Sequence, residues 1–297
     1  MIMWPGKSSY ELRPLLITAI LSILIGSCDL LDPDEPTPAY IHLNTPSLST
    51  DYAKEGSNSQ KISDYWVYVN DNLLGVFEFP IEFPVLAEGD ARVEVFAGIK
   101  NNGISAQRRA YPFYRPYVND SSAFLVADES LVLDPKFSYE SNTEFSWLED
   151  FERVNLSIEN GSSSGAQLVT LNSDLAFQGQ NCGQVILDKT NPSCFFTQSE
   201  YVVLPKFGTE VYLEINYRND ASLVVGVRSL YSDGSARDLD AVVINPSSSW
   251  NKIYVDLTDI ISDEVNAVSS LIYFYASYSD SKDSEEILID NIKLLHF

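Results

Sequence analysis

The stretch VYLEINYR, residues 211–218, has the side-chain pattern of a half-buried β-strand. Val211, Leu213 and Ile215 are aliphatic, and the residues between them carry polar groups or an aromatic ring. Because successive side chains of a strand point to opposite faces of a sheet, one face would pack into a core and the other would meet solvent or a partner. WNKIYVDL, residues 250–257, repeats the pattern.

Short runs of this kind, rich in Tyr, Val, Ile and Phe, recur along the chain between clusters of Gly, Asn, Asp, Ser and Pro. Such runs are typical of strands, and helical periodicity is nearly absent. We therefore predict an all-β fold. The length suggests two domains, which we place at 39–138 and 144–297 with a linker at 139–143.

The first domain is most legible at DYWVYVNDNLLGVFEF, residues 64–79, where Asn70-Asp71-Asn72 supplies a turn between two strands. Further turns at 88–90 and 101–103 predict a small β-sandwich. The segment from Val67 to Lys100 resembles PEGA-type and related Ig-like surface modules. This resemblance implies a spacer or binding platform that lacks catalytic residues.

The second domain carries four recognisable segments: WLEDFE (147–152), VYLEINYR (211–218), WNKIYVDLT (250–258) and ILIDNIKL (287–294). Together they look like a galactose-binding-like jelly roll, a fold shared by many carbohydrate-binding modules and by adhesion and protease accessory domains. The resemblance implies the fold but fixes no ligand.

Polar and aromatic side chains share the outward face of two predicted strands. Aromatic rings that stack on sugar faces, beside groups that bond hydroxyls, are the chemistry of glycan recognition. The alternative is the wet face of a half-buried sheet, covered by the first domain or by a partner protein. The candidate residues are Tyr212, Glu214, Asn216 and Arg218 on one strand, and Trp250, Lys252, Tyr254 and Asp256 on the other.

RRAYPFYRPY, residues 108–117, is the one basic, aromatic-rich segment of an acidic chain. Arg and Tyr are enriched in interface hot spots, so Arg108 and Arg109 are candidate partner-binding residues. The alternative is that the tyrosines pack at a domain edge while the arginines pair with neighbouring acids.

Asp290 interrupts the apolar last strand, and in jelly rolls the first and last strands lie near each other. Asp150 and Glu152 would then approach Asp290, and clustered carboxylates suit a structural Ca²⁺. The alternative is that Asp290 caps a turn or accepts backbone hydrogen bonds.

Cys182 and Cys194 flank a turn segment, Lys-Thr-Asn-Pro-Ser. In an oxidising compartment we predict a disulfide that closes this loop and contributes roughly 3 kcal/mol. A metal site there is disfavoured, because the only histidines are His42 and His296.

The apolar run Leu15–Ile25 is too short for a membrane span and follows Lys7 and Arg13, as in a signal peptide. Residues 24–28, LIGSC, resemble the lipobox of bacterial lipoproteins. That resemblance implies a signal peptide at 1–27 and acyl chains such as palmitate on Cys28.

Residues 28–38 form an acidic, proline-rich tether. Acidic residues after the cysteine resemble the surface-export signal of Bacteroidota lipoproteins, which implies the outer face of the outer membrane. An acidic tether without a sorting role is the alternative.

The net negative charge disfavours one class of function, nucleic-acid binding. Removing residues 1–27 leaves 17 basic and 41 acidic residues, a field that repels nucleic acid. No G-x-S-x-G, H-E-x-x-H or P-loop motif occurs. A paired-carboxylate glycosidase is not excluded by motif, but we expect a non-enzymatic protein.

The leading hypothesis is a lipid-anchored scaffold subunit of an outer-membrane protein complex that serves secretion, assembly or uptake. The alternative hypothesis is a glycan-binding surface lipoprotein that uses the jelly roll.

Overall fold

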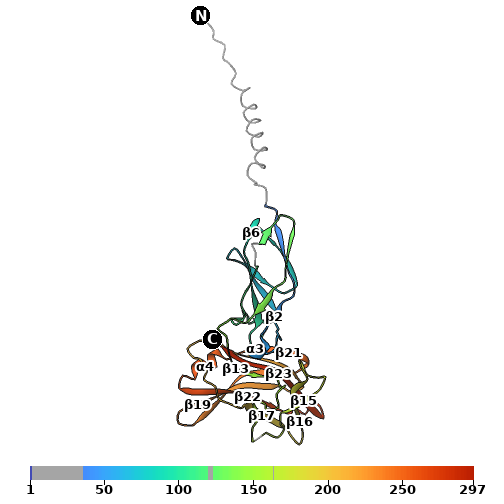
Figure 1. Ribbon diagram of the computed structural model, residues 1–297, viewed down its shortest axis with the longest axis vertical. Helices are drawn as coiled ribbons and strands as arrows, with labels where there is room; N and C mark the ends of the chain where they lie inside the picture. Colours follow the sequence, from blue (N-terminus) through green and yellow to red (C-terminus); the bar gives the residue numbers. More distant parts are fainter. Residues whose placement is uncertain (2–35, 120–122, 163) are drawn as a thin grey trace.

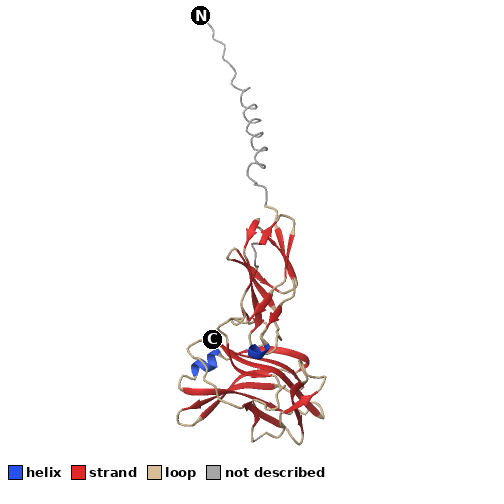
Figure 2. Ribbon diagram, viewed as in Figure 1, coloured by secondary structure: helices blue, strands red, loops and turns tan. Residues whose placement is uncertain are grey.

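The computed structural model describes residues 1, 36–119, 123–162 and 164–297. The predicted signal peptide and Cys28 lie outside these residues. Strands dominate the described part, which has only two short helices, α3 (Tyr52–Glu55) and α4 (Thr258–Asp263) (Figure 2). The predicted all-β class is confirmed. None of the helices in the described part is long and apolar enough to cross a membrane.

The first domain contains strands β1 to β12 and forms a small sandwich at one end of the molecule (Figure 1). One sheet has the order β4-β3-β7-β8, with β9 also paired to β7, and a second has the order β11-β1-β5. The strands are β1 (Ala39–Leu43), β2 (Ser47–Ser49), β3 (Asp64–Val69), β4 (Asn72–Phe77), β5 (Ile81–Val85), β6 (Gly89–Ala91), β7 (Val93–Lys100), β8 (Arg108–Ala110), β9 (Tyr117–Val118), β10 (Ala123–Leu125), β11 (Ser130–Leu133) and β12 (Lys136–Ser138).

The predicted turn between β3 and β4 lies at Asn70 and Asp71, whose φ angles are 50° and 62°. Asn and Asp tolerate this left-handed backbone, which matches the twist of the two flanking strands. The turn places β4 on one side of β3, and β7 pairs with its other side; the side chains of Val67 and Val95 are fully buried.

The second domain is a two-sheet antiparallel sandwich. The chain passes repeatedly between sheets of order β15-β16-β23-β18-β21, to which β13 adds, and β14-β17-β22-β19-β20, as in a jelly roll. The strands are β13 (Glu144–Glu149), β14 (Ile158–Asn160), β15 (Val169–Asn172), β16 (Asn181–Asp188), β17 (Ser193–Gln198), β18 (Val211–Asn219), β19 (Leu223–Tyr231), β20 (Ala236–Ile244), β21 (Ser247–Asp256), β22 (Ala267–Ser277) and β23 (Ser284–His296).

Strand parity in β18 and β21 follows the prediction. Leu213 and Val255 are fully buried in the core between the two sheets of the second domain. Tyr212, Tyr254 and Leu295 lie on the opposite face of the six-stranded sheet and belong to the hydrophobic core of the first domain. The first domain therefore covers part of that face, as one of the two interpretations expected.

The predicted disulfide between Cys182 and Cys194 is wrong. Both cysteines are free and buried, because β16 and β17 are not a hairpin but belong to different sheets. Cys194 lies in the core of the sandwich. Cys182 lies three positions before the core residue Val185 on β16, so its side chain points to the opposite, outer face of the sheet.

Both thiols should resist modification in the folded protein. Burial raises the pKa of Cys182 and of Cys194 to about 11, which leaves little thiolate near neutral pH. We expect Ellman's reagent to react with neither thiol in the folded protein. It should react with both once the protein is unfolded in a buffer that contains no reductant. A mass two hydrogens lower than that of the dithiol form would contradict this.

Candidate functional site at the domain junction

Aromatic rings join the two domains. Tyr111, Phe113 and Tyr114 follow β8 of the first domain and pack against β18 and β21 of the second. The ring centroids of Tyr111 and Tyr254 are 4.8 Å apart, and those of Tyr111 and Tyr212 are 5.4 Å apart with nearly perpendicular planes. An edge-to-face pair such as Tyr111 and Tyr212 stabilises by about 0.5–1.5 kcal/mol beyond the area it buries.

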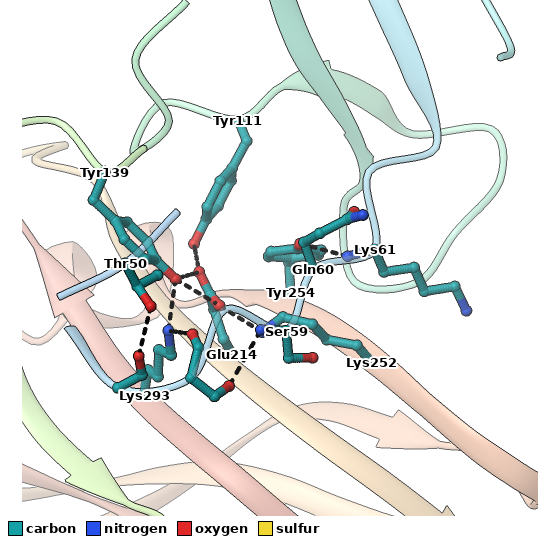
Figure 3. Close-up of polar contacts among 12 residues, drawn as sticks. Thr50, Ser59, Gln60, Lys61, Tyr111, Tyr139, Glu214, Lys252, Tyr254 and Lys293 are labelled. Carbon is teal, nitrogen blue, oxygen red and sulfur yellow. Dashed lines mark hydrogen bonds and ion pairs between the residues drawn. The ribbon is translucent and has the colours of Figure 1, made fainter. Parts of the chain in front are cut away.

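A fully buried carboxylate, that of Glu214 on β18, lies beneath these rings (Figure 3). Tyr111 donates a hydrogen bond from its hydroxyl to Oε1 at 2.8 Å, and the hydroxyl of Tyr139 lies 3.0 Å from each carboxylate oxygen. Nζ of Lys252, on β21, is 2.7 Å from Oε2. Both domains thus supply partners to a single anion.

Lys293, on β23, extends the cluster towards the loop after α3. Its buried ammonium group donates to the carbonyl oxygen of Ser57 at 2.6 Å and to the hydroxyl of Tyr139 at 3.1 Å. Burial lowers the pKa of Lys293 to about 7, and the charge of Glu214 opposes this shift. Burial likewise raises the pKa of Tyr111 and Tyr139 well above its ordinary range, and Glu214 adds to that effect.

Burial acts to raise the pKa of Glu214, but the charges of Lys252 and Lys293 outweigh it, so the pKa is lowered. The carboxylate therefore stays ionised between the domains. A buried ion set of this kind costs desolvation energy and is stable only when every partner is in place. Because these partners come from both domains, the hydrogen bonds and ion pairs of Glu214 fix the position of one domain on the other.

The predicted partner-binding arginines pair within the molecule. Arg109 bonds Glu210 at 2.6 Å and the hydroxyl of Tyr212 at 3.0 Å, both across the domain boundary. Arg108 bonds Glu78 at 2.6 Å and lies 3.5 Å from Asp64. The structure thus matches the alternative interpretation of the 108–117 segment, in which tyrosines pack and arginines neutralise nearby acids.

A cavity of about 300 Å³ opens beside the buried ions, between the two domains. Lys252 and Tyr254 border both the cavity and the cluster. The first domain contributes Lys61, Ile62, Ser63, Glu78, Lys100 and Gly103 to its wall, and the second contributes Tyr217, Asn251, Lys252, Ile253 and Tyr254.

The remaining candidates on the outward face lie away from this cavity. The indole of Trp250 donates to the carbonyl oxygen of Leu175 at 2.9 Å and contacts the ring of Phe177. Arg218 pairs with Glu286 at 2.8 Å. Asn216 is buried. The predicted ligand-binding residues therefore fall into two groups, one at the junction and one elsewhere on the sheet.

The predicted calcium ligands are engaged by backbone N–H groups. Oε1 of Glu152 accepts from the amides of Gln180 and Asn181 at 2.7 and 2.8 Å. Asp290 accepts from the amide of Gln178 at 3.1 Å, as the alternative interpretation expected. Burial raises the pKa of Asp290 to about 7.

Within the described residues, no three His, Cys, Asp or Glu side chains are grouped so that they could hold a metal. The calcium site at Asp150, Glu152 and Asp290 stays a prediction.

Sequence reasoning missed Tyr139 and Lys293, which complete the junction, and Lys61 and Lys100, which line the cavity. One signal was present: Lys293 interrupts an apolar strand at a position that pairs with Glu214 in the sheet register. No pattern in the first domain points to Lys61, because contact between the domains brings it to Asn251.

We expect Glu214→Ala to lower the free energy of unfolding by about 3–5 kcal/mol, since it leaves buried lysines without their anion. Urea unfolding followed by tyrosine and tryptophan fluorescence measures the loss. Asp238→Asn is the matched control, because it breaks a partly exposed pair with Arg228 and should cost less than about 1 kcal/mol. Equal losses in both variants would contradict the role of Glu214.

Stability should rise with pH between about 7 and 10 because of Lys293. In that range the folded state has lost the proton of Lys293, while the unfolded chain, with the ordinary pKa of 10.5, retains it. The limiting slope is about 1.4 kcal/mol per pH unit. Urea midpoints across this range should show the rise in the native protein and in Lys136→Met, which alters an exposed lysine. A Lys293→Met protein that keeps the same slope would refute this assignment.

Comparison with known proteins gives partial structural likenesses. No protein-family model matches the chain, and no curated protein matches it. A CBM22-1 xylan-binding domain of Paenibacillus barcinonensis Xyn10C is 15% identical with a TM-score of 0.38, covering 52% of this chain and 94% of that domain.

Two further solved structures are similar in the same way. The family 11 carbohydrate-binding module of Clostridium thermocellum Lic26A-Cel5E is 15% identical with a TM-score of 0.33, covering 52% of this chain and 95% of that one. TmCBM61, solved with β-1,4-galactotriose, is 17% identical with a TM-score of 0.30, covering 52% and 91%. These values are too low to indicate a shared ligand.

Proposed function

We propose that this chain is a lipid-anchored, non-enzymatic glycan-binding protein of the outer membrane, and that its ligand site is the junction cavity. The observation that carries the proposal is the cavity itself, which both domains build. A volume of about 300 Å³ lies at the lower end of the range for small-molecule sites, about 300–1,000 Å³.

The wall of the cavity offers the groups that a sugar requires. Tyr217, Ile253 and Tyr254 form the apolar part of its lining. Asn251 and Ser63 supply hydrogen-bonding groups for the hydroxyls of a sugar. The amide of Asn251 is already oriented, since its Nδ2 donates to the hydroxyl of Tyr217 at 3.0 Å.

The buried ions support this assignment through rigidity. The cavity keeps its shape only while the domains stay docked, and Glu214 with its partners holds them together. A preformed site loses less conformational entropy on binding than one that must assemble.

A scaffold subunit of an outer-membrane complex is the second candidate. The observation that favours it is the apolar surface of the first domain, where Leu86 and Phe124 have 72% and 65% of their surface exposed. Exposed apolar side chains of this size can serve as contacts to a partner protein.

Asn251→Ala should abolish retardation by the recognised polysaccharide in affinity electrophoresis, because it removes a hydrogen-bonding group from the cavity wall. Trp250→Ala is the matched control on the neighbouring residue, since its indole contacts Leu175 and Phe177 instead. It should leave retardation unchanged, and thermal unfolding should verify that both variants fold.

Loss of retardation in Trp250→Ala alone would move the site to the rest of the sheet. If no glycan retards the native protein and a membrane protein copurifies with it at fixed stoichiometry, the scaffold function replaces the proposal.

A further inference from the structure

Two lysines of the junction cavity find no carboxylate partner among the described residues. Nζ of Lys61 donates to the side-chain oxygen of Asn251, and the ammonium group of Lys100 has neither an ion pair nor a hydrogen bond with any described residue. Burial lowers the pKa of Lys61, and the charge of Lys100 lowers it further. The two ammonium groups therefore repel each other across the same space.

The other charges at the cavity cancel in pairs. Glu78 bonds Arg108 at 2.6 Å, and Lys252 lies 2.7 Å from Glu214. What remains is the positive charge of Lys61 and Lys100, in a chain whose formal net charge is −23. An anion entering the cavity would relieve their repulsion.

Lys252 lies deeper in the same wall. Its side chain is only 2% exposed, and beyond the contact with Glu214 its ammonium group finds no hydrogen-bond acceptor in the described part of the chain. An ammonium group has three donors, and a buried donor without an acceptor is costly. Because this nitrogen has almost no accessible surface, a ligand in the cavity does not reach it, and recognition of an anion there falls to Lys61 and Lys100.

We propose that the junction cavity binds an acidic sugar, a uronic acid residue, with its carboxylate at Lys61 and Lys100 and its hydroxyls at Ser63 and Asn251. This inference rests on the proposed glycan-binding function and adds the class of sugar. The formal net charge of −23 disfavours a dense polyanion. It is compatible with one acidic residue in an otherwise neutral chain.

The test uses the full chain in detergent and isothermal titration calorimetry. The probes are the methyl glycosides of glucuronate and galacturonate, those of glucose and galactose, and inorganic sulfate. We expect a uronate to bind about two- to fivefold more tightly than its neutral counterpart, the gain typical of one partly exposed ion pair. Lys61→Gln and Lys100→Gln should each reduce that preference, whereas Lys136→Gln, an exposed lysine of β12, should not.

The outcomes separate this inference from the function beneath it. Equal binding of uronates and neutral sugars, reduced by Asn251→Ala, overturns the acidic specificity and leaves the glycan site standing. Sulfate that binds as tightly as the uronates, with the same lysine dependence, overturns the sugar in favour of a simple anion site. Absence of binding by every sugar, neutral or acidic, overturns both proposals.

Discussion

The carboxylate of Glu214 is the constraint on which the rest of the structure depends. It is withdrawn from water only because the first domain covers it, and it is tolerable there only because Tyr111, Tyr139 and Lys252 all reach it. An isolated buried charge would cost several kcal/mol. Docking of the domains and neutralisation of this group are therefore one event.

The position of the cavity follows from that constraint. The first domain occupies the part of the six-stranded sheet that bears Tyr212 and Tyr254, and this leaves an opening at its edge beside Asn251. Neither domain contains the site alone. The sequence predicted an open sugar-binding face on β18 and β21. In the structure some of those side chains pack in the junction between the domains, and others line the cavity beside it.

Strand parity was readable from the sequence, because alternation at Leu213 and Val255 depends only on local geometry. The sequence did not show that the first domain covers the opposite face of this sheet. That arrangement depends on contacts between residues more than 70 positions apart, such as Tyr139 with Glu214. The disulfide prediction failed for the same reason. Nearness of Cys182 and Cys194 along the chain suggested a hairpin, whereas the chain crosses between sheets there.

The shared core at Tyr212, Tyr254 and Leu295 has an evolutionary consequence. Spacer modules in multidomain chains are commonly exchanged by recombination, since few contacts bind them to their neighbours. A domain that replaced the first one here would need tyrosine hydroxyls in the positions of Tyr111 and Tyr139 to bond the carboxylate of Glu214. The two halves of this chain are thus expected to be inherited together, and to diversify along their outer surfaces while the seam between them changes slowly.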